Sequence, residues 1–300
     1  MKILISGASG FAGTALSQAL RAQRHAVSHL VRPGKTLGPG DVSWDPNSAT
    51  ADVPAMEGFD AVVNLNGAGV ADGRWSERRK QILRNSRVAT TRVLVDSLAH
   101  LRRKPRVFVS ASAVGYYGNR GDAVLTESSG HGSDFLSLLG RAWEAEAMCA
   151  IPLGIRTVML RIGVILSAEG GALPRMVRPF RIGLGGRLGS GEQWMSWIAL
   201  DDVLEIIRMV MCGDEWSGPI NVVAPNPVRN SDFTRVLADV LHKPAFFPVP
   251  AFALRLALGE MADALLLTSQ RVMPARLISG GYSFRFPEIE PALRAMLLSS

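Results

Sequence analysis

The feature that most constrains the fold lies in the first thirteen residues, where an apolar run meets three regularly spaced glycines. Ile3-Leu4-Ile5 is typical of a buried strand, and Gly7, Gly10 and Gly13 follow it in a G-x-x-G-x-x-G spacing before an amphipathic helix. This arrangement leaves free backbone N–H groups where a pyrophosphate can bind. The motif therefore predicts a dinucleotide site, the alternative being a turn that only lets strand and helix pack closely. The expected contact residues are Gly7, Ser9, Gly10, Phe11, Ala12 and Gly13.

Strand-like apolar segments alternate with helical periodicity along the first two thirds of the chain. This alternation is typical of a parallel, doubly wound sheet, so we expect an α/β fold of the Rossmann type. Helices are expected after Trp75, over 135–146 and around 203–210. Strands are expected at 3–5, 25–31, up to Trp44, 61–65, 106–110, 155–162 and 219–223.

The alternation breaks at Ser167. From there to Trp197 the chain is rich in Gly, Pro and Arg, and helical patterns recur near 231–241, 250–258 and 260–267. We expect a dinucleotide-binding Rossmann domain made of residues 1–166 and 197–224. A smaller, mainly helical substrate lobe would comprise residues 167–196 and 225–300.

Charge and composition narrow the class of partner. The 300 residues are 47% hydrophobic and carry a formal net charge of +7. The basic residues are dispersed, and the densest runs, Arg78–Lys80 and Arg102–Lys104, bracket an amphipathic helix. We therefore expect the positive charge to attract an anionic cofactor and a small anionic substrate rather than nucleic acid.

The sequence shows no signal peptide, membrane-spanning stretch or metal-binding cysteine pattern, and these observations bear on where the protein acts. The apolar run at residues 3–5 is too short for a signal peptide, and no apolar stretch is long enough to span a membrane. The two cysteines, Cys149 and Cys212, form no metal-ligand pattern, so no metal site is expected. These observations predict a cytoplasmic protein that does not act at a membrane and leave a homodimer open.

The segment after the second expected strand indicates which cofactor is bound. It reads Leu30-Val31-Arg32-Pro33-Gly34-Lys35, with a cation where NAD-specific sites usually carry an acid. Arg32 suits a 2′-phosphate, which favours NADP(H), although a solvent-exposed loop residue is the alternative. Asp45 either reaches the adenine amino group or forms a turn. Further on, Asn66, Gly67 and Ala68 are expected to let the backbone approach the ribose and diphosphate, loop flexibility being the alternative.

Several segments resemble a known family. With the glycine motif, the stretch from Val109 to Gly118 resembles the extended short-chain dehydrogenases/reductases. The segments 183–191, 194–198 and 224–228 resemble the atypical "epimerase family", or nucleoside-diphosphate-sugar epimerase-like, subgroup over nearly the whole chain. The resemblance implies a Rossmann core that binds NADP(H). One departure is Ala199, where the subgroup usually has His after Trp-Ile.

The catalytic pair of the larger superfamily is missing. That pair is a Tyr with a Lys four residues later, whose charge lowers the pKa of the phenol. None of the three tyrosines has such a Lys, and no lysine lies between Lys104 and Lys243. Leu136 and Gly140 are expected at the two positions.

A partial set of catalytic candidates remains. The resemblance aligns Ser112 with the superfamily's catalytic Ser, and a cap at the strand end is the alternative. Tyr116 or Tyr117 offers a phenol that, without a cationic neighbour, acts only as a neutral donor. Glu144 and Arg141 are interpreted as a structural pair. His131 is interpreted as a solvated loop residue, with a proton relay as the alternative.

The glycine-rich segment 175–197 is the candidate substrate side. Arg178 and Arg187 suit phosphates, and Trp194, with Trp197, suits stacking on a flat ring. The alternative is an interdomain hinge with buried tryptophans. Two functions follow: an epimerase-like oxidoreductase that uses NADP(H) on an unidentified anionic substrate such as a sugar nucleotide, or a non-catalytic NADP(H)-binding sensor or regulatory protein.

Overall fold

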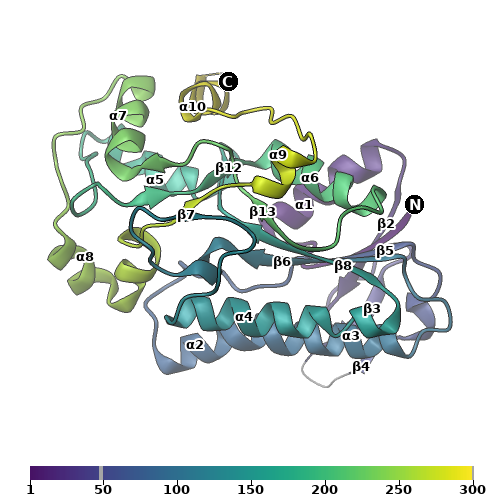
Figure 1. Ribbon diagram of the computed structural model, residues 1–300. Helices are drawn as coiled ribbons and strands as arrows, with labels where there is room; N and C mark the ends of the chain where they lie inside the picture. The colour runs from purple at the N-terminus through teal and green to yellow at the C-terminus, as the bar shows by residue number, and fades with distance from the viewer. Residues whose placement is uncertain (47–49, 299–300) are drawn as a thin grey trace.

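The computed structural model describes residues 1–46 and 50–298, and its centre is one eight-stranded sheet (Figure 1). The strand order is β13-β8-β6-β5-β1-β2-β3-β4, in which seven strands are parallel and only β4 runs antiparallel to its neighbour β3. The order reverses at β1, which confirms the predicted doubly wound sheet and places a crevice at the carboxyl ends of β1 and β5. The strands are β1 Lys2–Ser6, β2 Ala26–Val31, β3 Val42–Asp45, β4 Thr50–Ala51, β5 Ala61–Asn64, β6 Val107–Ala113, β8 Arg156–Ile162 and β13 Gly218–Val222.

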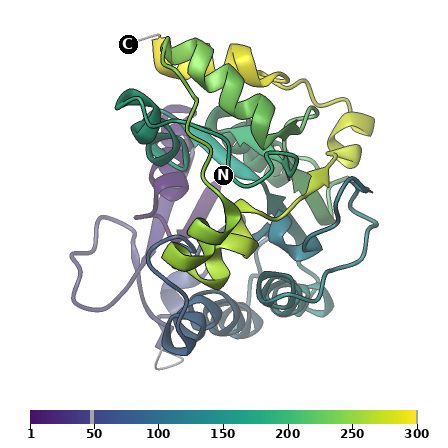
Figure 2. The same ribbon diagram turned by 90° about the vertical axis from the view of Figure 1, so that its left-hand side faces the viewer.

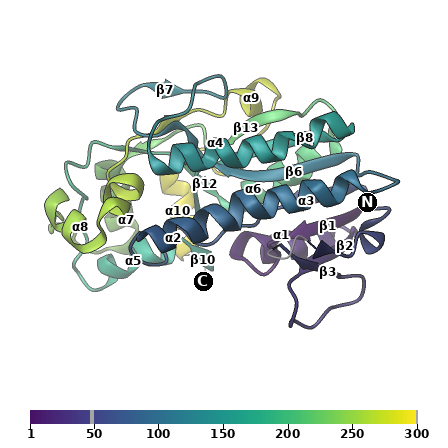
Figure 3. The same ribbon diagram turned by 90° about the horizontal axis from the view of Figure 1, so that it is seen from below.

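Helices cover both faces of the sheet because alternate strand residues point to opposite sides. Ile3 and Ile5 lie in one hydrophobic cluster with Val203 and Ile206, whereas Leu4 packs in the other. Helices α1 and α6 cover the first face, and α3 and α4 lie side by side on the second (Figures 1 and 3). Their bounds are α1 Phe11–Ala22, α3 Thr90–Ala99, α4 Phe135–Met148 and α6 Leu200–Cys212.

The helix expected after Trp75 is interrupted by a wider turn. Helix α2 comprises Glu77–Arg84 and is capped by Ser76, whose hydroxyl accepts a hydrogen bond from the Arg79 amide. A π-helical turn, η2 (Asn85–Ala89), then joins α2 to α3. Such turns are frequent at functional sites.

The C-terminal elements form a smaller lobe around a third hydrophobic cluster, seen in green and yellow in Figure 2. Helices α5, α7 and α10 supply its core. Helix α5 was not predicted, and a π turn stands where a helix was expected at 260–267. The division of the chain into two domains stays a prediction. The helical elements are α5 Leu173–Arg181, α7 Asn230–Leu241, α8 Ala251–Leu258, η5 Ala262–Leu266, α9 Ala275–Ser279 and α10 Ile289–Leu298.

The remaining elements are short strands and 3-10 turns. Over residues 1–46 and 50–298, none of the helices combines the length and hydropathy needed to cross a lipid bilayer. The remaining strands are β7 Val124–Leu125, β9 Val164–Ser167, β10 Gly170–Gly171, β11 Trp194–Met195, β12 Trp197–Ala199, β14 Val228–Arg229 and β15 Arg271–Val272. The 3-10 turns are η1 Pro54–Met56, η3 Val114–Tyr117 and η4 Ile151–Leu153.

Candidate functional site

The glycine motif forms a tight loop between β1 and α1. Gly7 has a φ of +74°, and a Cβ built on it would lie 2.5 Å from the Leu65 carbonyl oxygen. A Cβ on Gly13 would lie 2.3 Å from the Gly7 oxygen. Helix α1 starts after Gly10, and no side chain in the described part of the chain caps it. The first N–H groups of α1 are therefore available to an anion.

A cavity of about 540 Å³ opens beside this loop, a size that suits a small-molecule site. Gly7, Ser9 and Asn66 line it on the loop side, and Arg32 and Lys35 line it at the end of β2. Neither cation forms an ion pair with any residue that the structure describes. A backbone cradle that a side chain would fill, next to two free cations, fits a dinucleotide that carries an additional phosphate.

The other predicted cofactor residues are not among those that line this cavity, and their contact with a cofactor stays a prediction. Gly10, Phe11, Ala12 and Gly13 form the turn into α1, and a Cβ on Gly170 would lie 2.6 Å from the Phe11 ring. Asp45 ends β3, where its contact with an adenine stays a prediction. Lys35 and Trp44 line the cavity and were missed, although Lys35 stands in the same basic segment as Arg32.

One wall of the cavity is a polar chain between α1 and β2. His29 Nε2 lies 3.1 Å from the Ser17 hydroxyl, and its Nδ1 lies 3.4 Å from an oxygen of Asp41. Burial lowers the pKa of His29, while the Asp41 charge opposes the shift in part. The imidazole therefore favours its neutral form more than a free histidine does.

Two residues of the π turn η2 form hydrogen bonds with the loop after β5. The Ala68 amide donates to the Ser86 hydroxyl at 3.0 Å, and Arg87 Nη2 donates to the Ala68 carbonyl oxygen at 3.0 Å. A Cβ on Gly67 would lie 3.1 Å from Arg87 Cζ. Burial, with the nearby Arg79 charge, lowers the pKa of Arg87 to about 10, so the guanidinium stays charged at neutral pH.

At the end of β6, Ser112 belongs to a buried network. Its hydroxyl donates to Glu144 at 2.7 Å, and Arg161 donates two hydrogen bonds of 2.8 Å to the same carboxylate. Burial opposes the charged form of Arg161, but the bonds and charge of Glu144 raise its pKa. The expected pairing of Glu144 with Arg141 was wrong, because Arg161 is the partner and Arg141 is exposed.

Tyr117 belongs to the same network. Its buried hydroxyl donates to Asn221 at 2.6 Å and accepts from Arg161 at 3.0 Å. Burial raises the pKa of Tyr117 to about 12, so the phenol is neutral. The hydroxyls of Ser112 and Tyr117 are thus both engaged within the protein.

Tyr116 is the more accessible of the two candidate phenols. It is half-buried, and its hydroxyl has no hydrogen-bond partner within residues 1–46 and 50–298. Arg161 Cζ lies 3.7 Å from the centroid of its ring, so the expectation that it lacks a cationic neighbour was wrong. The ring of His131 lies 6.0 Å away, and His131 Nδ1 contacts the Gly132 oxygen at 2.6 Å.

The helix positions expected for the absent Tyr–Lys pair pack against η3. A Cβ on Gly140 would lie 3.3 Å from Tyr116 Cα, and one on Gly115 would lie 3.3 Å from Leu136 Cβ. The close approach of α4 to η3 therefore leaves little room for a longer side chain at Gly140.

The predicted substrate residues lie in separate settings. Arg178 is exposed on α5, a helix rather than the expected loop. Trp194 donates to Asp122 at 2.7 Å, and Arg229 and Arg271 flank its ring. Trp197 is buried in the lobe core, which rules out the expected stacking on a ligand.

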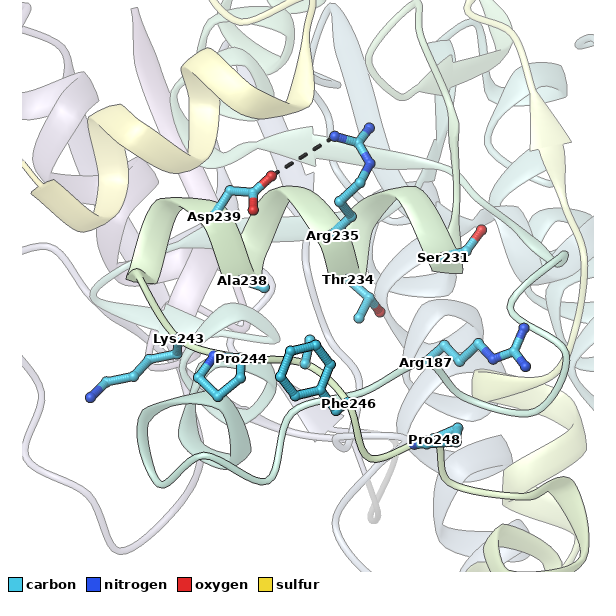
Figure 4. A pocket seen from close by; sticks show the side chains of 11 residues that line it. Arg187, Ser231, Thr234, Arg235, Ala238, Asp239, Lys243, Pro244, Phe246 and Pro248 are labelled. Carbon is cyan, nitrogen blue, oxygen red and sulfur yellow. Dashed lines mark ion pairs between the residues drawn. The ribbon is translucent and has the colours of Figure 1, made fainter.

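Arg187 lines a second cavity, also of about 540 Å³, between α7 and residues 243–248 (Figure 4). Lys243 and Phe246 line the cavity opposite α7. On α7, Arg235 Nη1 lies 3.9 Å from Asp239 Oδ2. None of the glycine-loop residues lines this cavity. Backbone amides of the glycine loop and cations without a described ion-pair partner thus meet at the first cavity and not at the second.

Comparisons with known proteins agree with this arrangement. The model of the NAD dependent epimerase/dehydratase family matches residues 3–222, and a domain of unknown function (DUF1731) matches residues 249–296. An epimerase family protein of Mycobacterium tuberculosis, MT2273, is 41% identical over 97% of this chain and 96% of its own length.

Two solved structures are similar over almost the whole chain. The crystal structure of human epimerase family protein SDR39U1 (isoform 2) with NADPH has a TM-score of 0.91 and 33% identity, covering 100% of both chains. The nucleoside-diphosphate sugar epimerase of Corynebacterium glutamicum has a TM-score of 0.82 and 36% identity, covering 99% of this chain and 58% of that one.

Proposed function

Since the chain belongs to the NAD dependent epimerase/dehydratase family, we propose that it binds NADP(H) in the cavity beside the glycine loop. The observation that carries this proposal is the presence of Arg32 and Lys35 in the same cavity as Gly7 and Ser9. The NADPH in the human relative's crystal structure supports it and agrees with the cofactor predicted from the sequence.

Each part of the cofactor has candidate ligands on this chain. The amides at the start of α1, near Gly10 and Ser9, suit the diphosphate. Arg32 and Lys35 suit the 2′-phosphate, Asp45 the adenine, and the loop at 66–68 the ribose. When bound, the nicotinamide ring supplies or accepts a hydride.

We propose an epimerase-like or oxidoreductase reaction on an anionic substrate such as a sugar nucleotide. The candidate residue is Tyr116, whose unpaired phenol would donate a hydrogen bond to a substrate oxygen. Ser112 and Tyr117 would act as positioning residues, because their hydroxyls are engaged with Glu144 and Asn221. Residues 167–196 and 225–300 would form the substrate lobe.

The second candidate function is a non-catalytic NADP(H)-binding protein whose cofactor state governs a partner contact. It is favoured by the engagement of Ser112 and Tyr117 within the protein and by the missing lysine at Gly140. Both functions share the same cofactor site, so they differ only in turnover.

A calorimetric titration with NADPH and NADH tests the cofactor site. Arg32→Ala is expected to weaken NADPH binding by about 10- to 100-fold and to change NADH binding little, because one charge-assisted contact to the 2′-phosphate is lost. Arg141→Ala, which removes an exposed arginine on α4, is the control. Equal weakening of both nucleotides would exclude the 2′-phosphate role.

A turnover assay then separates the two candidate functions. NADPH oxidation or product formation is followed with a panel of sugar nucleotides and other anionic carbonyl compounds. Turnover that is lost in Tyr116→Phe while NADPH affinity is kept would support the enzyme. NADPH binding without turnover of any compound would favour the sensor.

A further inference from the structure

The second cavity, between α7 and residues 243–248, is closed on one side by a restricted segment of the chain (Figure 4). The chain leaves α7 at His242, which has a φ of +51°, and the Lys243 amide donates to the Ala238 carbonyl oxygen at 3.0 Å. Three of the next seven residues are prolines, whose rings fix their φ angles. This wall of the cavity therefore has little conformational freedom.

The same segment is held by the stretch of chain that precedes β11. The Phe247 amide donates to the Gly185 carbonyl oxygen at 3.2 Å, and the Val249 amide donates to the Arg187 carbonyl oxygen at 2.9 Å. A Cβ on Gly186 would overlap the Phe247 carbonyl group, so the two stretches are in direct backbone contact. The cavity is therefore formed before any ligand arrives, as most small-molecule sites are.

One end of the cavity brings together a cation and two hydroxyl groups. A Cβ built on Gly191 would lie 3.2 Å from Ser231 Cβ and 3.3 Å from Arg187 Cδ, so the Ser231 and Arg187 side chains converge there. Arg187 Nη1 donates to the Ser190 carbonyl oxygen at 3.1 Å, and its guanidinium forms no ion pair with any described residue. Thr234 follows Ser231 by one turn of α7 and lies on the same face of the helix.

Thr234 is a buried polar residue that the protein leaves without a partner. Its side chain is only 7% exposed and points from α7 into the cavity. Its hydroxyl forms no hydrogen bond within residues 1–46 and 50–298. Because a buried hydroxyl without a partner is costly, this group indicates a polar ligand atom in the cavity.

The rest of the cavity combines an apolar surface with a second cation. The ring of Phe246 is 81% exposed and lies across from Thr234 (Figure 4). Lys243 lies at the far end and forms no ion pair with any described residue. Asp239 and Arg235 also line the cavity, but they are directed at each other on the side of α7 away from this loop. The charge beside the loop is therefore positive.

We propose that this cavity is a second ligand site, separate from the cofactor cavity, and that it takes a nucleoside monophosphate. The phosphate binds between the Arg187 guanidinium and the hydroxyls of Ser231 and Thr234, which all donate hydrogen bonds. The base stacks on Phe246, and Lys243 donates to an acceptor at the edge of the base. A volume of about 540 Å³ suits a ligand of this size. The two cavities share no lining residue, so this site does not depend on the proposed NADP(H) site.

A calorimetric titration with guanosine 5′-monophosphate tests the proposal. Guanine is absent from NADP(H), and its O6 and N7 offer acceptors to Lys243. Inorganic phosphate and guanosine, which are the two parts of this probe, are titrated beside it. We expect the monophosphate to bind at least about 10-fold more tightly than either part, because the two contacts are made by one molecule. If the monophosphate does not bind, the proposal fails. Equal affinity for inorganic phosphate would mean an adventitious ion only and would also overturn it.

Matched pairs of variants locate the bound monophosphate. Arg187→Met and Phe246→Ala should each weaken its binding by about 10-fold, through loss of the phosphate contact and of the stacking surface. Arg178→Met and Phe252→Ala make the same changes at exposed positions outside the cavity and should leave the affinity unchanged. Equal losses within either pair would indicate unspecific attraction to the surface and would contradict the proposal.

Two further variants test the buried hydroxyl and the separation of the cavities. Thr234→Val should weaken binding by about 2- to 10-fold without lowering the urea midpoint, because the hydroxyl has no described partner to lose. Arg32→Ala, in the cofactor cavity, should leave the affinity for the monophosphate unchanged. If Arg32→Ala abolishes this binding while Arg187→Met does not, the ligand lies in the cofactor cavity and the proposal is wrong. Failure of the protein to bind NADPH would instead contradict the proposed function, and the monophosphate titration would still decide the second site.

Discussion

The carboxyl edge of the sheet is built in two different ways. At β1 and β2 it presents helix amides and the cations Arg32 and Lys35, none of them paired with a described side chain. At β6 and β8 the polar groups of Ser112, Glu144 and Arg161 are bonded to one another and buried.

This difference distinguishes polar groups that can bind a ligand from polar groups that stabilise the fold. Polar groups left unpaired beside a cavity can be satisfied by a ligand, whereas a network that satisfies itself stabilises the fold. The amides and cations at β1 and β2 therefore suit a phosphate-bearing ligand. The network at β6 and β8 is explained by its contribution to the stability of the fold. Tyr116, which is close to the network but bonded to none of its members, stands between the two.

Breaking the network should give the largest effect on stability. Glu144→Ala leaves the Arg161 guanidinium buried without its carboxylate, so we expect a loss of about 3–5 kcal/mol in the free energy of unfolding. Urea denaturation measures it. Glu146→Ala, which removes the exposed ion pair with Arg92, should cost less than about 1 kcal/mol. Similar losses in the two variants would contradict the contrast between a buried network and an exposed pair.

Filling the glycine loop should have a smaller effect on stability and a specific effect on the cofactor side. Gly7→Ala puts a Cβ at a positive φ and against Leu65, so we expect a loss of about 1–3 kcal/mol and weaker NADPH binding. Gly58→Ala has a similar φ of +80° with open space around it, lies outside the basic segment 32–35, and is the matched control. Unfolding and calorimetry report the two effects. Unchanged NADPH affinity in a folded Gly7→Ala protein would remove the loop from the cofactor site.

The smallest effect concerns pH. The pKa of His29 is lowered in the folded state, mainly by burial, so the unfolded chain binds a proton more readily. The stability that the neutral His29 contributes is fully present above its unfolded-state pKa of about 6.5. It is lost as the pH falls from there through the lower pKa of the folded state. His29→Gln should flatten the fall in melting temperature below pH 6.5, and His100→Gln, at the exposed end of α3, should not. Equal slopes for His29→Gln and the unaltered protein would exclude this role.

The sequence predicts the features that depend on neighbouring residues. The strand–glycine–helix motif is local, and continuous apolar strands indicate a parallel sheet, so the doubly wound fold was predicted correctly. The network at β6 could not be predicted, because Arg161 lies inside an apolar strand and meets Glu144 only through packing of α4. The positions of individual site residues stay predictions.

Two local errors have physical causes. Pro174 and Pro179 suggested an irregular segment, yet Pro174 lies in the first turn of α5, where an N–H has no intrahelical partner. The turn η2 was not distinguished from a regular helix, because apolar periodicity changes little over five residues. Arg187 and Trp194 are near in sequence, but Arg187 lines the cavity beside α7 whereas Trp194 donates a hydrogen bond to Asp122. Their spacing in the sequence does not predict this separation.

The π turn makes the number of residues between Ser76 and Thr90 matter as much as their identity. Such a turn holds about one residue more than an α turn, which rotates the following helix by about 100° relative to the preceding one. Deleting a single residue from η2 would restore the regular phase and swing Ser86 and Arg87 away from Ala68, or α3 away from the sheet. Insertions and deletions here should therefore be selected against even where substitutions are accepted, so length, rather than composition, is what this segment has to preserve.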